Sequence, residues 1–207
     1  MKKIILSLIV GSMLFAENSG NTLDKVMLDL SNKNFDSAIT QLKSMKETPK
    51  IDFLIGKAYF DKHLTYTDYK LAYNYLKKSN TPQALYYIAK MYEKGLFVKQ
   101  DMKEAIRYFK NSNTKEAKYR LAMIYLKGEY VLKDPKEGLK LLQASAKAGY
   151  NLAKFELGKL YLSDNEIVDK DLEQAAKWIF LAQDDDNLRP AAQKIWNKYK
   201  LYLYQNK

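Results

Sequence analysis

The sequence ASAKAGYNLAKFELGKLY, from Ala144 to Tyr161, contains a spacing that recurs along most of the chain. Counted back from Tyr161, Gly158 lies three residues earlier, Leu157 four residues earlier and Ala153 eight residues earlier. A small residue and an apolar residue precede three further tyrosines in the same way: Tyr59, Tyr92 and Tyr125. The four tyrosines are 33, 33 and 36 residues apart. A repeat of this length is typical of stacked helical hairpins, so the spacing predicts an all-α fold.

The length and composition fit one globular domain. The chain has 207 residues, of which 47% are hydrophobic and 29% charged, with only 8 glycines and 4 prolines. This composition is typical of a folded helical protein rather than a disordered one. The sequence contains no cysteine, so the fold needs no disulfide even outside the cytoplasm.

The N-terminal residues resemble a secretory signal peptide. Lys2 and Lys3 are followed by an apolar run over residues 4–15 and then by Ala16. We expect residues 1–16 to be removed and residues 17–207 to form a single α-solenoid domain in the periplasm. The apolar run is too short to cross about 30 Å of hydrocarbon comfortably, so we expect no stable membrane anchor.

The formal net charge is +11, and it stays strongly positive without Lys2 and Lys3. A basic excess can indicate nucleic acid, an anionic membrane surface or an acidic partner. Export argues against nucleic acid. The other interpretation is that the lysines simply coat solvated helix faces, and the sequence leaves this open.

The repeat frame sets the order of the helices within residues 17–207. We predict a degenerate first pair over residues 23–45, four clear repeats over about 51–183 and a terminal helix over about 189–205. Trp196 occupies a place that is small in the other copies, so the terminal helix should close the array. Each second helix should start at an aspartate that caps its free amides. These aspartates are Asp68, Asp101, Asp134 and Asp171.

Small residues recur on both helices of each predicted pair. They would let the two backbones approach near the short end of the usual range of about 8–10 Å. They are Gly56, Ala89, Ala122 and Gly158 on first helices, and Ala72, Ala105, Gly138 and Ala175 on second helices. We expect the repeat tyrosines to lie mostly in the core and to cover the neighbouring repeat, with hydroxyls that reach water or a carbonyl.

The run from Ala146 to Tyr161, followed by Val168 and Asp171, resembles a Sel-one-like repeat, a bacterial relative of the tetratricopeptide repeat. YEKGLFVKQD from Tyr92 to Asp101 and YLKGEYVLKD from Tyr125 to Asp134 match the same pattern. The resemblance implies a right-handed α/α superhelix of paired antiparallel helices, whose first helices line a concave surface that binds proteins. Some secreted members of this family are cysteine-rich and linked to penicillin binding, and this chain lacks those cysteines.

Motifs for catalysis, cofactors or metals are weak in this sequence. Ser112 to Lys115 fits S-x-x-K and Ser163 to Asn165 fits S-D-N, a pair used by penicillin-recognising enzymes, but both lie in predicted turns and no K-T-G follows. The only histidine, His63, has no cysteine to share a zinc site with. The remaining acidic candidates lack the spacing of a calcium loop: Asp169, Asp171 and Asp184 to Asp186. We expect no enzyme activity, no cofactor and no metal.

The sequence therefore predicts a non-enzymatic periplasmic scaffold or adaptor whose partners are other proteins of the cell envelope. A flagellar motor or a secretion apparatus is the kind of complex expected. One alternative is a cell-wall or β-lactam-recognising enzyme, and another is carriage of a peptide or ligand in an aromatic pocket. The predicted contact residues are first-helix positions that point away from the small-residue seam: Tyr87, Lys90, Met91, Lys94, Lys118, Met123 and Lys154.

Overall fold

The computed structural model describes residues 22–62 and 65–204. The predicted signal peptide over residues 1–16 and His63 lie outside the described residues. The chain divides into two compact units, unit 1 over residues 1–99 and unit 2 over residues 100–207. The single domain over residues 17–207 stays a prediction.

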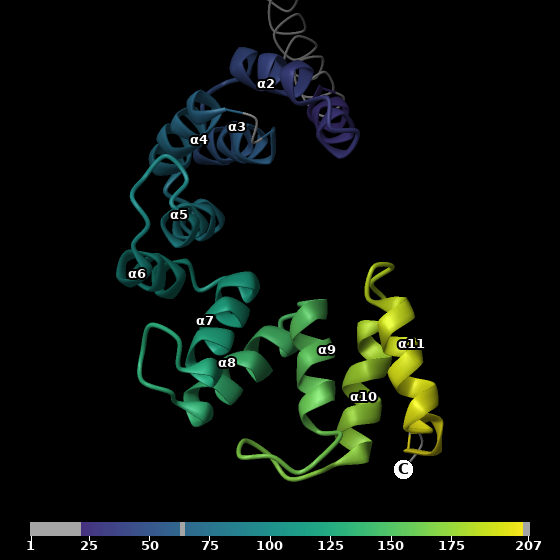
Figure 1. The fold of residues 1–207 in the computed structure, drawn as a ribbon. Coiled ribbons are helices and arrows are strands. Elements are labelled where there is room, and N and C mark those ends of the chain that lie inside the picture. The colour runs from purple at the N-terminus through teal and green to yellow at the C-terminus, as the bar shows by residue number, and fades with distance from the viewer. Residues whose placement is uncertain (1–21, 63–64, 205–207) are drawn as a thin grey trace, which may run out of the picture. The chain divides into compact units, whose positions relative to one another are not determined.

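All regular secondary structure in the described residues is helical, which confirms the all-α fold class (Figure 1). Unit 1 contains helical residues 22–31, α2 (Phe35–Ser44), α3 (Pro49–Lys62), α4 (Tyr66–Ser79) and α5 (Pro82–Lys94). Unit 2 contains α6 (Met102–Ser112), α7 (Lys115–Lys127), α8 (Pro135–Lys147), α9 (Asn151–Leu160), α10 (Leu172–Ala182), α11 (Arg189–Lys198) and the 3-10 helix η1 (Leu201–Tyr204).

The small-residue seams bring paired helices close together. α3 packs on α4, α7 on α8 and α9 on α10. At the α9–α10 seam, a Cβ atom on Gly158 would lie only 2.8 Å from Ile179 Cγ1. Equally tight contacts hold Gly56 against Leu76 and Gly138 against Leu126. The alanines at the remaining seam positions are fully buried, as predicted: Ala72, Ala89, Ala105, Ala122 and Ala175.

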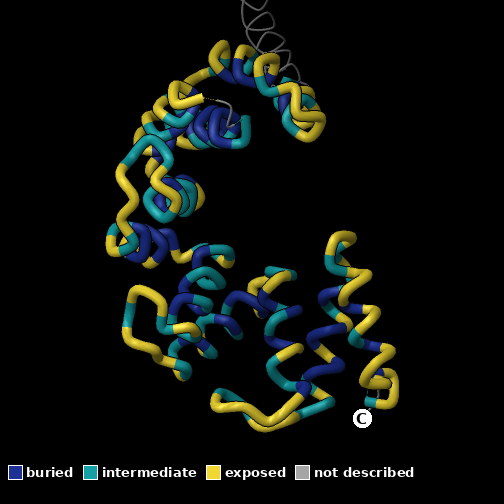
Figure 2. The backbone as a smooth tube through the Cα atoms, in the orientation of Figure 1, coloured by how far each residue is buried: buried dark blue, intermediate teal, exposed yellow. Residues whose placement is uncertain are grey.

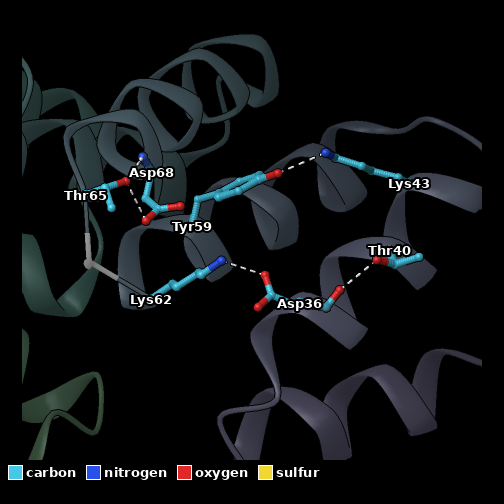
Figure 3. Close-up of polar contacts among 7 residues, drawn as sticks. All are labelled: Asp36, Thr40, Lys43, Tyr59, Lys62, Thr65 and Asp68. Atoms are coloured by element: carbon cyan, nitrogen blue, oxygen red, sulfur yellow. Dashed lines mark hydrogen bonds and ion pairs between the residues drawn. The ribbon is translucent and has the colours of Figure 1, made fainter.

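Three of the four predicted N-caps are confirmed: Asp101, Asp134 and Asp171 accept hydrogen bonds from first-turn amides of α6, α8 and α10. The start predicted at Asp68 is wrong, because α4 begins at Tyr66 and its N-cap is Thr65. Thr65 Oγ1 accepts a hydrogen bond from the Asp68 amide at 3.1 Å, and its hydroxyl donates to the Asp68 carboxylate at 2.8 Å (Figure 3). Asp68 therefore orients the capping hydroxyl instead of capping the helix.

Helical residues 22–31 and α2 lie where the degenerate first pair is predicted. Asp29 joins them, because its Oδ2 accepts hydrogen bonds from Ser37 Oγ at 2.8 Å and from Gln41 Nε2 at 2.7 Å. Lys62 Nζ at the end of α3 lies 2.6 Å from Asp36 Oδ1 of α2 (Figure 3). These polar contacts tie the first pair to the next repeat.

The repeat tyrosines contact the second helix of the preceding repeat. Tyr59 is buried and accepts a hydrogen bond from Lys43 Nζ of α2 at 2.9 Å (Figure 3). Tyr161 is half-buried and accepts a longer one, 3.5 Å, from Gln143 Nε2 of α8. These hydroxyls thus bind side chains, where the sequence predicts water or a carbonyl, and only Tyr59 of the four repeat tyrosines is buried.

The terminal helix α11 packs on α10 and is shorter than predicted. Trp196 is 8% exposed and shares a hydrophobic cluster with Phe155 of α9 and Ile179 of α10. The helix ends at Lys198, and Lys200 takes a left-handed conformation with φ 51°. This turn returns Leu201 to the same cluster, where it is fully buried. Figure 2 shows buried residues recurring along α9 and α10 between exposed ones.

Candidate protein-interaction surfaces

Aromatic side chains of α3 and α5 meet in unit 1. Phe53 and Phe60 lie seven residues apart on α3, and therefore on one face of it. The ring of Tyr87 on α5 lies 6.0 Å from the Phe53 ring and 5.0 Å from the Phe60 ring. Tyr86 lies 5.4 Å from Tyr87. We call these four residues, together with Lys90 of α5, the α3–α5 surface.

The Lys90 ammonium group lies over three of these rings. Its Nζ is 4.8 Å from the ring centroid of Phe60, 5.3 Å from that of Tyr87 and 5.6 Å from that of Tyr86. Such distances allow cation–π attraction. Burial, with the nearby charge of Lys94, lowers the pKa of Lys90, because a desolvated ammonium group is disfavoured. The surface therefore holds a partly dehydrated positive charge between the buried ring of Phe60 and the half-buried rings of Tyr86 and Tyr87.

A cleft of about 320 Å³ lies beside this surface. It is lined by Phe60 and Asp61 of α3, Tyr69 of α4, and Lys94 and Leu96 at the end of α5. Ligand pockets usually measure about 300–1,000 Å³, so this cleft is at the small end of that range. Its lining combines apolar walls with charged groups of both signs.

The structure brings three of the seven predicted contact residues together, because Tyr87 and Lys90 form part of the α3–α5 surface and Lys94 lines the adjoining cleft. Met91 does not join them. It is fully buried, so its predicted place at the surface is wrong. One helical residue turns the side-chain direction by about 100°, which moves Met91 from the face of Lys90 into the core.

The other three predicted contact residues lie in unit 2. Lys118 and Met123 on α7 are partly exposed. Lys154 on α9 donates hydrogen bonds from Nζ to Asn151 Oδ1 at 2.9 Å and to the Leu181 carbonyl at 3.4 Å. Lys154 therefore helps to join α9 to α10.

An aromatic position that was not predicted recurs on the first helices. Tyr119 of α7 packs against Tyr150, with ring centroids 5.2 Å apart. Burial is the main cause that raises the pKa of both hydroxyls. An aromatic residue stands six residues before each repeat tyrosine, and this spacing could have revealed the position: Phe53, Tyr86, Tyr119 and Phe155.

A second cleft, missed entirely, lies between α8 and α10 and measures about 460 Å³. We call it the α8–α10 cleft. Its lining is largely polar and comes from α8, from the end of α9 and from α10: Gln143, Lys147, Tyr161, Asp171, Gln174, Lys177 and Trp178.

The two serine motifs have structural explanations. Ser112 is 3% exposed, and its hydroxyl lies 3.1 Å from that of Thr114, the N-cap of α7. In the S-D-N segment, Asn165 Oδ1 accepts hydrogen bonds from the amides of Ile167 and Val168. The first serine is thus inside the fold, and the second motif shapes a loop.

The aspartates considered as metal ligands partly serve the backbone. Asp171 caps α10, and Asp185 Oδ1 accepts a hydrogen bond from the Asn187 amide at 3.0 Å. Over residues 22–62 and 65–204, no three or more acidic or histidine side chains group as a metal site would require. Within these same ranges, no helix combines the length and apolar character needed to cross a bilayer.

Comparisons with known proteins agree with this architecture. The Sel1 repeat profile matches residues 55–80, 82–112, 115–150 and 151–182. A solved Sel1 repeat protein from Oxalobacter formigenes is similar with a TM-score of 0.70 and 24% identity, over 84% of this chain and 74% of that one. At this identity the similarity shows the fold alone, and it confirms the predicted solenoid of helix pairs.

A protective antigen of uropathogenic Escherichia coli strains that displays an SLR fold has a TM-score of 0.44 and 18% identity, over 88% of this chain and 58% of that one. A TM-score this low supports no argument about this chain. A search of curated proteins found no match.

Proposed function

The chain belongs to the Sel1 repeat family, and from this membership we propose that it is a periplasmic scaffold that binds other proteins. Stacked helical pairs expose one face of successive helices along the array, which suits them to hold a partner segment. Binding of proteins follows from the family. The compartment and the choice of partner are our proposal.

The α3–α5 surface is the observation that supports a contact site best. Tyrosine often supplies much of the binding energy in protein interfaces, because its ring buries a large area with few rotatable bonds. Here three rings surround the Lys90 ammonium group, and Lys94 is exposed beside them. This combination fits a partner segment that carries an apolar side chain next to an acidic one.

The proposed partner is a protein of a cell-envelope complex, such as a flagellar motor or a secretion apparatus. The support is the signal-like sequence over residues 1–16 together with the basic surplus of the chain. Export is tested by isolating the periplasmic fraction and measuring the mass of the protein. The mass should equal that of a chain that begins directly after Ala16. Recovery of the full chain from the cytoplasm alone would contradict export.

A catalytic role has weaker support than a scaffold role. A serine nucleophile needs an accessible hydroxyl beside a base. Ser112 is buried against the helix cap of α7 instead. We therefore propose a non-enzymatic function and do not develop the β-lactam-recognising alternative.

A photo-crosslinking residue in place of Lys94 tests the contact site in intact cells. We expect one dominant covalent adduct with an envelope protein, identified by mass spectrometry. Adding Tyr87→Ala and Lys90→Glu should remove the adduct, because these changes delete a ring and reverse the buried charge. The matched control carries the crosslinker in place of Lys70, an exposed lysine of α4.

Two results would contradict the proposed site. One is an equal yield and the same adducts from the Lys70 position. The other is an adduct at Lys94 that persists unchanged after both substitutions on α5.

A further inference from the structure

Both units contain a cleft between the second helices of two successive repeats. In unit 1 it lies between α2 and α4, and in unit 2 it is the α8–α10 cleft. Three lining positions correspond between the two clefts. Lys43 and Glu47 lie as far after the N-cap of α2 as Gln143 and Lys147 lie after the N-cap of α8. Tyr75 corresponds to Trp178, because each directly precedes the residue that packs on a seam glycine.

The cleft of unit 1 is filled by carboxylates of the chain itself. Lys78 Nζ lies 2.6 Å from Glu47 Oε1 and 3.6 Å from Asp52 Oδ1. The Asp52 side chain is only 6% exposed, so this second carboxylate is inside the fold. The remaining space is about 120 Å³. The positive charge of this cleft is thus neutralised internally.

Unit 2 has lysines at the two positions of these acids, and one of them, Lys147, lines the α8–α10 cleft. Lys147 stands at the place of Glu47, and Lys154, seven residues before Tyr161, stands at the place of Asp52, seven residues before Tyr59. Lys177 adds another ammonium group to the lining. Among the described contacts, neither Lys147 nor Lys177 forms an ion pair with a carboxylate.

The one carboxylate in the α8–α10 cleft is already engaged. Asp171 Oδ1 accepts hydrogen bonds from the amides of Glu173 at 3.0 Å and Gln174 at 2.9 Å. The open space, about 460 Å³, is therefore lined by two lysines that pair with no carboxylate and by one carboxylate that stays at the helix cap. An outside carboxylate would restore the charge balance that unit 1 achieves with Glu47 and Asp52.

The neutral lining favours a peptide as the carrier of that carboxylate. Gln174 presents an amide that can both donate and accept hydrogen bonds, as a peptide group does. Gln143 Nε2 already donates to the Tyr161 hydroxyl, so Gln143 can accept through its oxygen and Tyr161 can donate from its hydroxyl. Trp178 also lines the cleft although it is only 8% exposed, and Lys177 Nζ lies 5.3 Å from its ring centroid.

We infer that the α8–α10 cleft binds an acidic side chain and the adjoining backbone of a peptide segment from a protein partner, with Lys147 and Lys177 pairing with the carboxylate. This inference rests on the proposed scaffold function and specifies the chemistry of one of its contacts. It places that contact on second helices, whereas the α3–α5 surface uses first helices.

The test is an NMR titration of the mature chain with the peptide acetyl-Gly-Glu-Glu-Gly-amide at low ionic strength. The indole N–H signal of Trp178 should shift saturably, while that of Trp196, in the α11 cluster, should stay in place. Lys147→Glu and Lys177→Glu should each weaken binding by about tenfold or more, since each replaces attraction by repulsion. Lys194→Glu, at an exposed position of α11, is the control of equal charge change.

Several outcomes would overturn the inference. One is equal binding of the peptide analogue that carries glutamine in place of both glutamates. Another is a shift of the Trp178 indole signal with inorganic phosphate and none with the peptide. Equal weakening by Lys194→Glu would indicate a general charge effect, and Lys147→Gln and Lys177→Gln repeat the test without charge reversal. If the peptide does not bind but the crosslinker at Lys94 still gives an adduct in cells, the assignment of this cleft is wrong and the scaffold proposal stands.

Discussion

Lys43 and Lys90 both place their ammonium groups against tyrosine, with opposite effects on pKa. The hydrogen bond from Lys43 Nζ to the Tyr59 hydroxyl raises the pKa of Lys43. The contribution of this hydrogen bond to stability is present below the ordinary lysine pKa of 10.5 and is lost as pH rises through the raised pKa of Lys43. Lys90 has the reverse sign, because burial lowers its pKa. Between this lowered pKa and 10.5 the unfolded chain binds more protons at this site, so stability rises with pH there.

Lys90→Met should increase the free energy of unfolding near neutral pH by about 0.5–1 kcal/mol, because it keeps the packing against the rings and removes a desolvated charge. The advantage should shrink as pH rises toward the ordinary lysine pKa. Urea denaturation at neutral and alkaline pH measures both effects. Lys94→Met, at an exposed lysine one turn away, should change stability by less than about 0.5 kcal/mol. A Lys90→Met variant less stable than the parent would show that the cation–π contacts outweigh desolvation.

At this scale the sequence predicted chemistry better than orientation. Tyr87 and Lys90 lie on the α3–α5 surface and Lys94 lines the cleft beside it, whereas Met91, predicted to face the same way, lies in the core. Adjacent side chains on a helix differ in direction by about 100°, so which of two neighbours is buried depends on how the helix is rotated about its axis. For α5 this rotation is set by packing against α3, which the sequence of α5 alone does not reveal.

At the scale of elements, local signals predicted helix starts where they acted alone. Asp101, Asp134 and Asp171 cap their helices as the spacing predicts. At α4 two capping residues compete, and Thr65 takes the N-cap while Asp68 binds its hydroxyl. The end of α11 depends on a distant partner, since Leu201 turns back into the cluster with α10. Such a boundary has no local signal.

Gly158→Ala should lower the free energy of unfolding by about 1–3 kcal/mol, although alanine is the better helix former. Its Cβ atom would meet Ile179 Cγ1 at 2.8 Å and the Ile179 backbone nitrogen at 3.0 Å. A backbone atom cannot move aside as a flexible side chain can, so α9 and α10 would have to separate. Thermal unfolding followed by circular dichroism measures the loss. An unchanged or higher midpoint would mean that the two helices do not approach this closely in solution.

At the scale of the whole molecule, the period predicted the helix pairs but not the spaces between successive pairs. A hairpin forms from residues close in sequence, and its pattern of small residues and tyrosines repeats. A cleft between two second helices depends on what each copy places at one position, as Glu47 and Lys147 show. A comparison of the residues that differ between the aligned repeats, rather than of those they share, would have revealed the lysines of the α8–α10 cleft.

Stability in a repeat array should also depend mainly on neighbouring copies. Trp196→Ala removes a nearly buried indole from the cluster that α11 forms with α9 and α10, and should cost about 3–5 kcal/mol within unit 2. Hydrogen exchange measured by mass spectrometry should show lost amide protection in α9, α10 and α11, and unchanged protection in α3 and α4. Tyr202→Ala, at a residue that is 54% exposed, should leave both sets of amides as they were. Equal loss of protection in α3 and α4 would mean that the chain unfolds as one cooperative body, because only global unfolding can carry the effect of Trp196 to helices so distant in the sequence.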